Sequence, residues 1–254
     1  SVRTARTVGG LVPHPAFELE AVSRDCSALL VAARQFRAPE PDEVVFDYPT
    51  VVYWAPMDGG APDTLGSFRG AELLAIHRGN PTGVRLVFGV EPQWASEGEL
   101  VYYGPGDRFE VQVLDSQGSL IRIIRWEGLR ERISDQEWER YSEERRQVIQ
   151  EYPPEGATLP SAGQYPGSGL KPTYSELLTD DQGNLWVQQY AFPGLIGPDN
   201  RPQEWWVFDS SGRWLGELQT PSGFRVKCID GSHIVGIAKD DYDVQRVELY
   251  EIKR

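Results

Sequence analysis

The chain repeats one short pattern, and this repetition constrains its fold more than any other feature. An apolar run with alternating side chains ends in an aspartate, a turn containing glycine follows, and a second apolar run begins. The pattern lies at 51–66, 110–121 and 205–216, with Asp58, Asp115 and Asp209 at equivalent places. Alternation is typical of a half-buried strand, and glycine supplies the positive φ of a tight hairpin turn. The sequence therefore predicts a repeat fold built from β-hairpins.

Four units of this kind follow one another along the 254 residues. Their strand-forming segments lie at 28–76, 84–126, 174–219 and 224–252. Units of about four antiparallel strands, connected as meanders, are typical of propeller blades. We therefore expect an all-β protein of the β-propeller type. It would form a single domain over residues 1–254, with about four recognisable four-stranded blades.

One segment departs from the strand pattern. Residues 134–152 are rich in Glu and Arg, and Ser134 is followed three residues later by Glu137, which is the signature of a helix capping box. The segment predicts one inserted α-helix at the rim of the sheets, ended by the prolines that follow it. Residues 153–173 contain many Pro, Gly and Ser residues, and they predict a crossover loop between units.

The balance of charges and the apolar runs exclude two classes of protein. The formal net charge is −13 at pH 7, and a phosphate backbone would be repelled by so acidic a protein, so we expect no nucleic-acid partner. No apolar run is long enough to cross a bilayer as a helix, so we expect no transmembrane segment.

The two cysteines lie near opposite ends of the sequence. In a closed ring of blades the first and last units are neighbours, so a disulfide between Cys26 and Cys228 is geometrically feasible. Two buried free thiols are the favoured interpretation, because a free cysteine packs as a small hydrophobic residue.

The C-terminal half carries the residues on which a family resemblance rests. These are YSELLTDDQGNLWVQQY at 174–190, WWVFDSSGRWLGEL at 205–218 and DDYDVQRVELYEI at 240–252. Together with LDSQGSLIRIIRW at 114–126 and DGGAPDTLGSF at 58–68, they resemble the bacterial six-bladed β-propeller proteins of the NHL and TolB types. The resemblance implies a six-bladed ring, of which the four units would be a part. A four-bladed or open assembly is the alternative. The matching motifs are architectural, so they predict a fold and not an activity.

The sequence contains no recognisable catalytic motif. Its histidines, His14, His77 and His233, are far apart, and none has a second His or Cys at the spacing of a metal site. His233 lies inside an apolar run and is interpreted as a core histidine. Asp240, Asp241 and Asp243 are the best metal candidates, because three carboxylates in four residues could ligate Ca²⁺. A turn is the favoured interpretation of this segment, since Asp side chains cap turns. We therefore expect no cofactor.

The aromatic residues suggest a partner-binding surface. Trp205, Trp206 and Trp214 lie on one predicted hairpin beside Arg213, and Trp138 lies on the predicted helix. Alternation places Trp205 on one face of its strand and Trp206 on the other. Packing between blades is the favoured interpretation, whereas exposed members of the set would anchor a partner, because Trp and Arg dominate binding hot spots.

The lack of a catalytic motif predicts a non-catalytic binding or scaffold protein with protein partners. The resemblance to exported propellers implies that it acts outside the cytoplasm, in the periplasm or as a secreted protein. A concrete form is an extrinsic subunit of a membrane-bound complex, attached peripherally, for example to a photosynthetic complex. Two alternatives remain open. One is a propeller enzyme, a hydrolase or lyase, with its active site in the central funnel. The other is a ligand-sensing domain.

Overall fold

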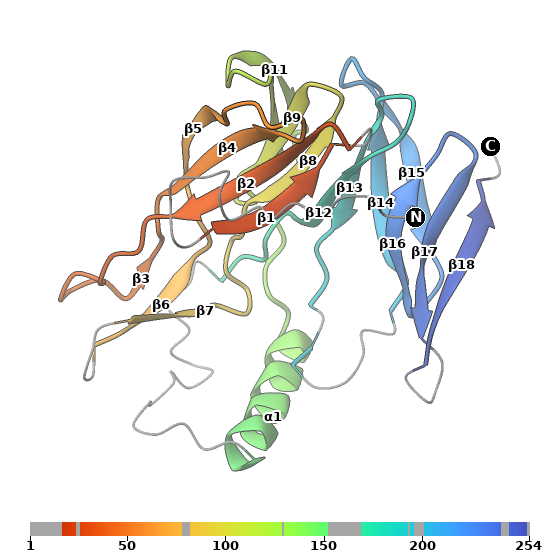
Figure 1. The fold of residues 1–254 in the computed structure, drawn as a ribbon. Coiled ribbons are helices and arrows are strands. Elements are labelled where there is room, and N and C mark those ends of the chain that lie inside the picture. Colours follow the sequence, from red (N-terminus) through yellow and green to blue (C-terminus); the bar gives the residue numbers. More distant parts are fainter. Residues whose placement is uncertain are drawn as a thin grey trace.

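The structure is a computed structural model, and it describes residues 17–23, 26–77, 82–128, 130–151, 169–192, 194–195, 201–239 and 244–252. Almost all of the regular structure in these residues is antiparallel β-sheet (Figure 1). The prediction of an all-β fold of the propeller type is confirmed.

Four sheets are meanders or near-meanders that match the four predicted units. The first contains β1 (Phe17–Val22), β2 (Ala28–Arg34), β4 (Thr50–Pro56) and β5 (Asp63–Phe68). The second contains β8 (Gln93–Glu97), β9 (Leu100–Gly104), β10 (Glu110–Leu114) and β11 (Leu120–Arg125). The third contains β12 (Tyr174–Thr179), β13 (Leu185–Gln189), β14 (Gln203–Phe208) and β15 (Trp214–Thr220). The fourth contains β16 (Phe224–Ile229), β17 (His233–Lys239) and β18 (Gln245–Glu251).

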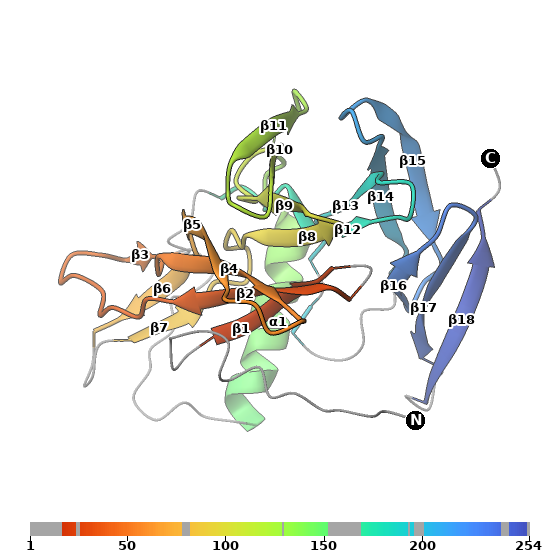
Figure 2. The ribbon, with the colours of Figure 1, turned by 45° about the horizontal axis from the view of Figure 1, so that its top comes forward.

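The sheets follow one another along an arc, as propeller blades do (Figures 1 and 2). Strand β1 packs beside β8, β8 beside β12, and β12 beside β16, so each sheet contributes its first strand to the inside of the arc. The later strands of each sheet lie progressively further out. Three blades have the predicted four strands. The fourth has three within the described residues, of which β18 lies furthest out.

A small fifth sheet was not predicted. It contains β3 (Val45–Phe46), β6 (Leu73–Ile76) and β7 (Thr82–Arg85), and it projects from the first blade. Its strands have two to four residues each, too few for a visible alternation.

The predicted helix is confirmed as α1 (Asp135–Glu151), which extends away from the sheets (Figure 1). The capping box is formed: Glu137 Oε2 accepts the Ser134 backbone N–H at 2.8 Å, and the Glu137 N–H is donated to Ser134 Oγ at 3.3 Å. Among the described residues no helix is both long and apolar enough to cross a membrane. Most of the predicted crossover, namely residues 153–168, lies outside the described part of the chain.

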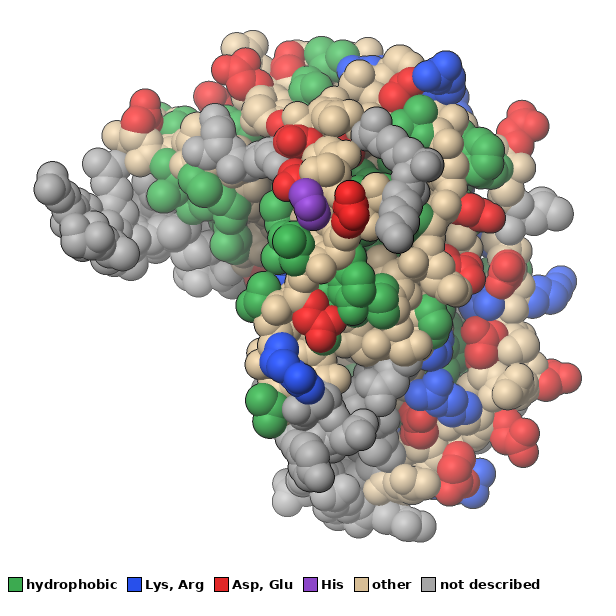
Figure 3. Space-filling model, turned by 90° about the vertical axis from the view of Figure 1, so that its right-hand side faces the viewer, with side chains coloured by type: hydrophobic (Ala, Val, Ile, Leu, Met, Phe, Trp, Pro, Cys, Tyr) green, Lys and Arg blue, Asp and Glu red, His purple; other side chains and the backbone are tan. Residues whose placement is uncertain are grey.

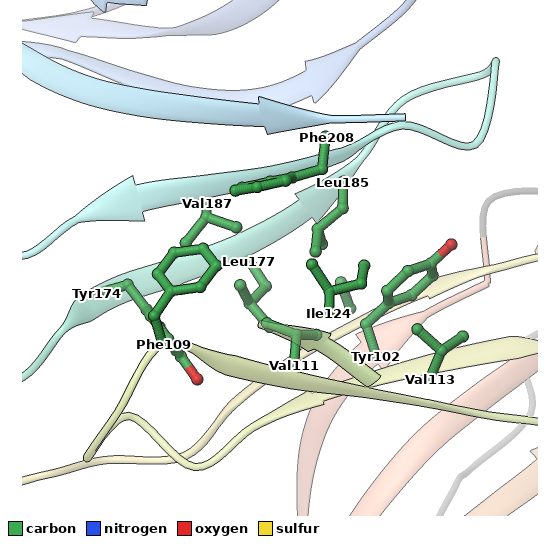
Figure 4. Close-up of a cluster of buried hydrophobic side chains, with 11 residues drawn as sticks. Tyr102, Phe109, Val111, Val113, Ile124, Tyr174, Leu177, Leu185, Val187 and Phe208 are labelled. Carbon is green, nitrogen blue, oxygen red and sulfur yellow. The ribbon is translucent and has the colours of Figure 1, made fainter. Parts of the chain in front are cut away.

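The core consists of layers between neighbouring blades. Apolar side chains of the second and third sheets interdigitate, as Figure 4 shows for Phe109, Val111, Leu177, Val187 and Phe208. A second layer joins the first and second sheets, and a third joins the third and fourth. Each layer removes apolar surface from water, which is the dominant favourable contribution to folding. This blade-on-blade packing holds the open arc together.

The repeated aspartate is a turn residue, as its repetition predicts. Asp115 Oδ1 accepts the backbone N–H groups of Gln117 and Ser119, two and four residues later. Asp209 accepts those of Ser211 and Arg213 in the same way. Each carboxylate thereby satisfies backbone donors that the tight turn leaves without partners.

The cysteine prediction was half right. Cys26 and Cys228 form no disulfide with each other, but both are exposed and not buried. Cys26 lies in the turn after β1 with a φ of 56°, and Cys228 lies at a bulge in β16. Irregular backbone at each position turns the thiol outward, which the apolar runs beside the cysteines did not reveal.

Candidate functional site

A cavity of about 810 Å³ opens where the second, third and fourth sheets meet. Its walls come from β12, β13, β14, β16 and β17 and from the segments before β8 and after β11. The lining mixes aromatic rings, amide side chains and charges of both signs. Binding sites for specific partners combine these features, because apolar surface supplies affinity and a few polar groups fix orientation.

Three tryptophans form a cluster at one end of this cavity. The Trp126 ring lies 5.6 Å from Trp206 with the planes tilted by 36°, and 5.5 Å from Trp214 with the planes almost perpendicular at 82°. Both geometries are favourable for aromatic pairs. Trp126 and Trp206 line the cavity. We call Trp126, Trp206 and Trp214 the tryptophan cluster.

The cluster joins two blades. Trp126 follows β11 of the second sheet, where its backbone N–H is donated to the Phe109 carbonyl at 3.2 Å. Trp206 and Trp214 lie on β14 and β15 of the third sheet, in the hairpin that the sequence predicts. Trp214 is 49% exposed and Trp126 is 36% exposed. Aromatic surface that is held rigidly and remains in water is typical of residues that anchor binding partners.

Amide and hydroxyl groups line the cavity beside the cluster. Gln188 and Gln189 lie on β13, Gln203 begins β14, and Thr173 precedes β12. Gln203 Oε1 and Thr173 Oγ1 are buried and have no hydrogen-bond partner in the described part of the chain. A buried polar atom without a partner costs free energy, so each is positioned to gain a hydrogen bond when the cavity is filled.

Charged groups of both signs face the cavity. Burial raises the pKa of Glu176 on β12 above its usual value, although the positive charges of Lys227 and Arg225 on β16 partly oppose this shift. Lys171 is held by ion pairs with Glu131 at 2.7 Å and Glu137 at 3.2 Å. The cavity is therefore not a uniformly charged site. It is suited to a partner that carries both polar and apolar groups.

The structure separates the predicted partner-binding residues. Trp206 and Trp214 belong to the tryptophan cluster. Arg213 is exposed at the hairpin turn and pairs with Asp209 at 3.1 Å. Trp138 is half-buried and packs on Phe88 at 5.4 Å, where it fastens α1 to the sheets.

Trp205 requires a correction. It is 0% exposed and packs with Trp186 and Phe224 between the third and fourth sheets. The predicted alternation is right, since Trp205 and Trp206 face opposite sides of the sheet. However, both sides of β14 are covered by neighbouring blades, so Trp205 has no surface for a partner.

The predicted metal and histidine residues do not line the cavity. Asp240, Asp241 and Asp243 lie outside the described residues, as does His14. His233 begins β17, next to Asp230 and Ser232, and its side chain is 39% exposed, so the interpretation as a core histidine is wrong. The opposite end of β17 lines the cavity. His77 lies beside the small fifth sheet, where its Nε2 is 2.7 Å from the Glu43 carbonyl oxygen. Within the described residues no group of His, Cys, Asp and Glu is arranged to hold a metal ion.

Sequence reasoning missed Trp126, Gln188 and Gln203. Trp126 follows the apolar run IRIIR directly, and an aromatic residue immediately after a hairpin strand was the available signal. The glutamines carry no sequence signal, because a polar residue in an alternating strand normally faces water.

Comparisons with known proteins add only coarse information. No protein-family model matches the chain, and no curated protein sequence is similar to it. Similar solved structures include a eukaryotic initiation factor, with a TM-score of 0.33, 8% identity, and coverage of 93% of this chain and 52% of that one. Another is a luciferin-regenerating enzyme, with a TM-score of 0.28 and 10% identity, and the match covers 96% of this chain and 93% of that one. A third is the WD40 domain of SCAP from fission yeast, with a TM-score of 0.26 and 7% identity, and the match covers 89% of this chain and 66% of that one. The chain spans about half the length of the initiation factor.

Proposed function

We propose that this chain is a non-catalytic binding protein that holds a protein partner at the tryptophan cluster and the adjoining cavity. The observation that carries the proposal is the half-exposed Trp214 ring, fixed edge-on against Trp126 at the boundary of two blades. Burying apolar surface is favourable by about 25 cal/mol per Å², so a partner that covers these rings gains binding free energy.

A protein partner accounts for the surroundings of the cluster. Leu215, next to Trp214, is 48% exposed. Arg213 at the hairpin turn supplies a charged group beside these apolar residues. Aromatic anchors with Arg and aliphatic residues around them are the composition of protein-protein interfaces.

The location and the assembly are part of the same proposal. The resemblance of the chain to bacterial six-bladed propellers of the NHL and TolB types supports a place outside the cytoplasm, in the periplasm or secreted. We propose that the protein is an extrinsic subunit attached peripherally to a membrane-bound complex, of which a photosynthetic complex is one example.

A photo-crosslinking residue in place of Trp214, introduced in the native cell, tests this proposal. The expected result is one dominant crosslinked protein, identified by mass spectrometry. A crosslinker in place of Phe36 is the matched control, since Phe36 is 61% exposed on the first blade, away from the cluster. Trp214→Ala should reduce the amount of that partner that co-purifies with the chain at least about tenfold. Equal crosslinking from both positions, or native purification of the chain alone, would overturn the proposal.

A further inference from the structure

We infer that the cavity binds a protonated alkyl amine, and that the ammonium group of this ligand pairs with the Glu176 carboxylate between the third and fourth sheets. The inference deepens the proposed function and rests on the cavity assigned there, because it names the chemistry that this cavity recognises. The ammonium group belongs either to a lysine side chain of the partner or to a free small amine.

A strip of polar side chains crosses the face of the third sheet that packs against the fourth. Glu176 on β12 is paired with Gln188 on β13, and Gln188 is paired with Trp205 on β14. Directly paired residues lie side by side on one face of a sheet, and for Trp205 this is the face against the fourth sheet. Gln203, two residues before Trp205, lies on the same face because side chains alternate along a strand. Glu176, Gln188 and Gln203 all line the cavity, and we call them the polar strip.

The Glu176 carboxylate makes no ion pair and no hydrogen bond within the described residues, although it is partly buried. Lys227 and Arg225 act on it only as more distant positive charges. Burial raises the pKa of Glu176 above its usual value, which is the sign of a carboxylate that water solvates poorly. A cation that comes within hydrogen-bonding distance would stabilise this group, because charge-assisted hydrogen bonds are about twice as strong as neutral ones.

The other end of the polar strip offers a second acceptor. Gln203 Oε1 is buried and has no hydrogen-bond partner in the described part of the chain. Gln188 lies between the two ends, and its Oε1 already accepts a hydrogen bond from Ser175 Oγ at 3.0 Å. The strip therefore lacks donors at both ends. A ligand with N–H groups supplies them, whereas an ionised carboxylate brings acceptors only.

The charge of the whole protein favours a cationic donor over a neutral one. The formal net charge is −13 at pH 7. Figure 3 looks onto the side of the molecule that carries the fourth sheet, and acidic side chains are spread over it. A negative potential raises the local concentration of cations and lowers that of anions. The ring of Phe224 also lines the cavity, and the faces of aromatic rings attract ammonium groups.

The size of the cavity indicates what the ammonium group is attached to. The volume of about 810 Å³ is far more than an ammonium ion needs, and it lies within the range of about 300–1,000 Å³ that is typical of sites for organic ligands. Phe224 and Ile237 add apolar surface to the wall on the side of the fourth sheet. An aliphatic chain that carries the amine would cover this surface, and the stem of a lysine side chain has the same character.

Three probes with the same alkyl chain and different head groups test the inference. Hexylamine is positively charged at pH 7, hexanol is neutral and hexanoate is negatively charged. Each is titrated into the isotope-labelled full chain, and NMR follows the side-chain amide signals of Gln188 and Gln203. We expect hexylamine to shift both signals and to bind at least about tenfold more tightly than hexanol or hexanoate.

Three variants assign the binding to Glu176. Glu176→Gln should raise the dissociation constant of hexylamine about tenfold and remove its advantage over hexanol. Glu217→Gln is the matched control, because Glu217 is exposed on β15 of the same sheet and does not line the cavity, and it should change nothing. Arg225→Gln should lower the dissociation constant about two- to threefold, since it removes a positive charge that opposes the ammonium group.

Four outcomes would overturn the inference. The first is equal binding of the three probes, and the second is equal binding of hexylamine by wild type and by Glu176→Gln that is folded by circular dichroism. The third is tighter binding of hexanoate, or weaker binding of hexylamine by Arg225→Gln, because a positive group would then hold the ligand. The fourth is the absence of any shift at about 50 mM hexylamine, which exceeds the dissociation constant expected for a ligand of this size.

Co-purification of the partner identified by crosslinking at Trp214 shows the source of the amine. If a lysine of the partner occupies the site, Glu176→Gln should reduce the co-purified amount about tenfold and hexylamine should compete with the partner. If a free amine occupies it, the co-purified amount should not change. Trp214 does not line the cavity, so Trp214→Ala should leave hexylamine binding unchanged. Failure of the crosslinking would thus remove the proposed function alone, and failure of the hexylamine titration would remove the amine site alone.

Discussion

The indole Nε1 of Trp186 donates a hydrogen bond to the Asp180 carboxylate Oδ2, and the two atoms are 3.0 Å apart in the interior of the third blade. The other carboxylate oxygen, Oδ1, accepts the backbone N–H groups of Gln182 and Asn184. Asp180 is only 2% exposed, whereas Asp115 makes the same turn and is only partly buried. One copy of the repeated turn is thus connected to the core through its aspartate.

Asp180→Ala should cost more stability than the matching substitution in another turn. We expect a loss of about 2–4 kcal/mol, because two backbone donors and a buried indole N–H lose their acceptor. Asp115→Ala, which removes only the turn hydrogen bonds, should cost about 1 kcal/mol. Urea unfolding measures both. Equal losses would show that the bond to Trp186 contributes nothing.

Glu110 should make the stability of the fold fall at low pH. Its side chain is 7% exposed, and its carboxylate accepts hydrogen bonds from Arg108 at 3.3 Å and from Arg125 at 2.9 Å. The hydrogen bond with Arg108, with that of Arg125, lowers the pKa of Glu110 from 4.5 to about 2. A carboxyl group whose pKa is lowered in the folded state stabilises the fold at every pH above its pKa in the unfolded chain. This contribution is lost as the pH falls from about 4.5 to 2.

Glu110→Gln measures that contribution. We expect it to destabilise the protein by about 2 kcal/mol at pH 7, since both arginines are partly exposed and screened by solvent. The difference from wild type should shrink as the pH falls from about 4.5 towards 2, as followed by urea titrations at each pH. A constant difference over that range would mean that the carboxylate charge is not responsible.

Glu20 on β1 should have the opposite effect. Burial and the negative charge of the nearby Glu18 together raise its pKa from 4.5 to about 7, although the positive charge of Arg34 opposes the shift. A raised carboxyl pKa means that the folded state binds the proton more tightly. The stability from Glu20 is therefore complete below about pH 4.5 and is lost as the pH rises through 7.

Glu20→Gln should stabilise the protein by about 1–2 kcal/mol at pH 8 and have little effect at pH 4.5. Thermal melts across this range test it. Glu18→Gln is an informative companion, because removing its charge should move the Glu20 transition to lower pH. If the stabilities of wild type and E20Q differ by the same amount at every pH from 4.5 to 8, the expectation is contradicted.

Gly118 should report the contact between the first two blades. It has a φ of +83°, and a Cβ there would lie 2.2 Å from the carbonyl oxygen of Leu65 on β5. Gly98 is the matched control, with a φ of +55° and open space around it. Gly98→Ala should cost about 1–2 kcal/mol from backbone strain alone, and Gly118→Ala at least about 2 kcal/mol more. Equal costs in chemical denaturation would mean that the turn can move away from β5.

Local patterns determined much of this protein. The hairpins, the turn aspartates, the capping box at Ser134 and the opposite facing of Trp205 and Trp206 are all correct from sequence. Each depends on residues within a few positions of one another, where strand alternation, helix geometry and turn chemistry act directly. The order of the four blades followed from the order of these units.

The contacts between distant segments were decided only by the tertiary structure. The sequence does not show that Trp126 meets Trp214 or that a neighbouring blade covers Trp205. Alternation specifies the two faces of a strand, but it does not specify what lies against each face. That is settled by how the blades stack along the arc, where side chains from separate sheets must fill one shared space. The candidate site lies at such a boundary, so it became visible only in the folded chain.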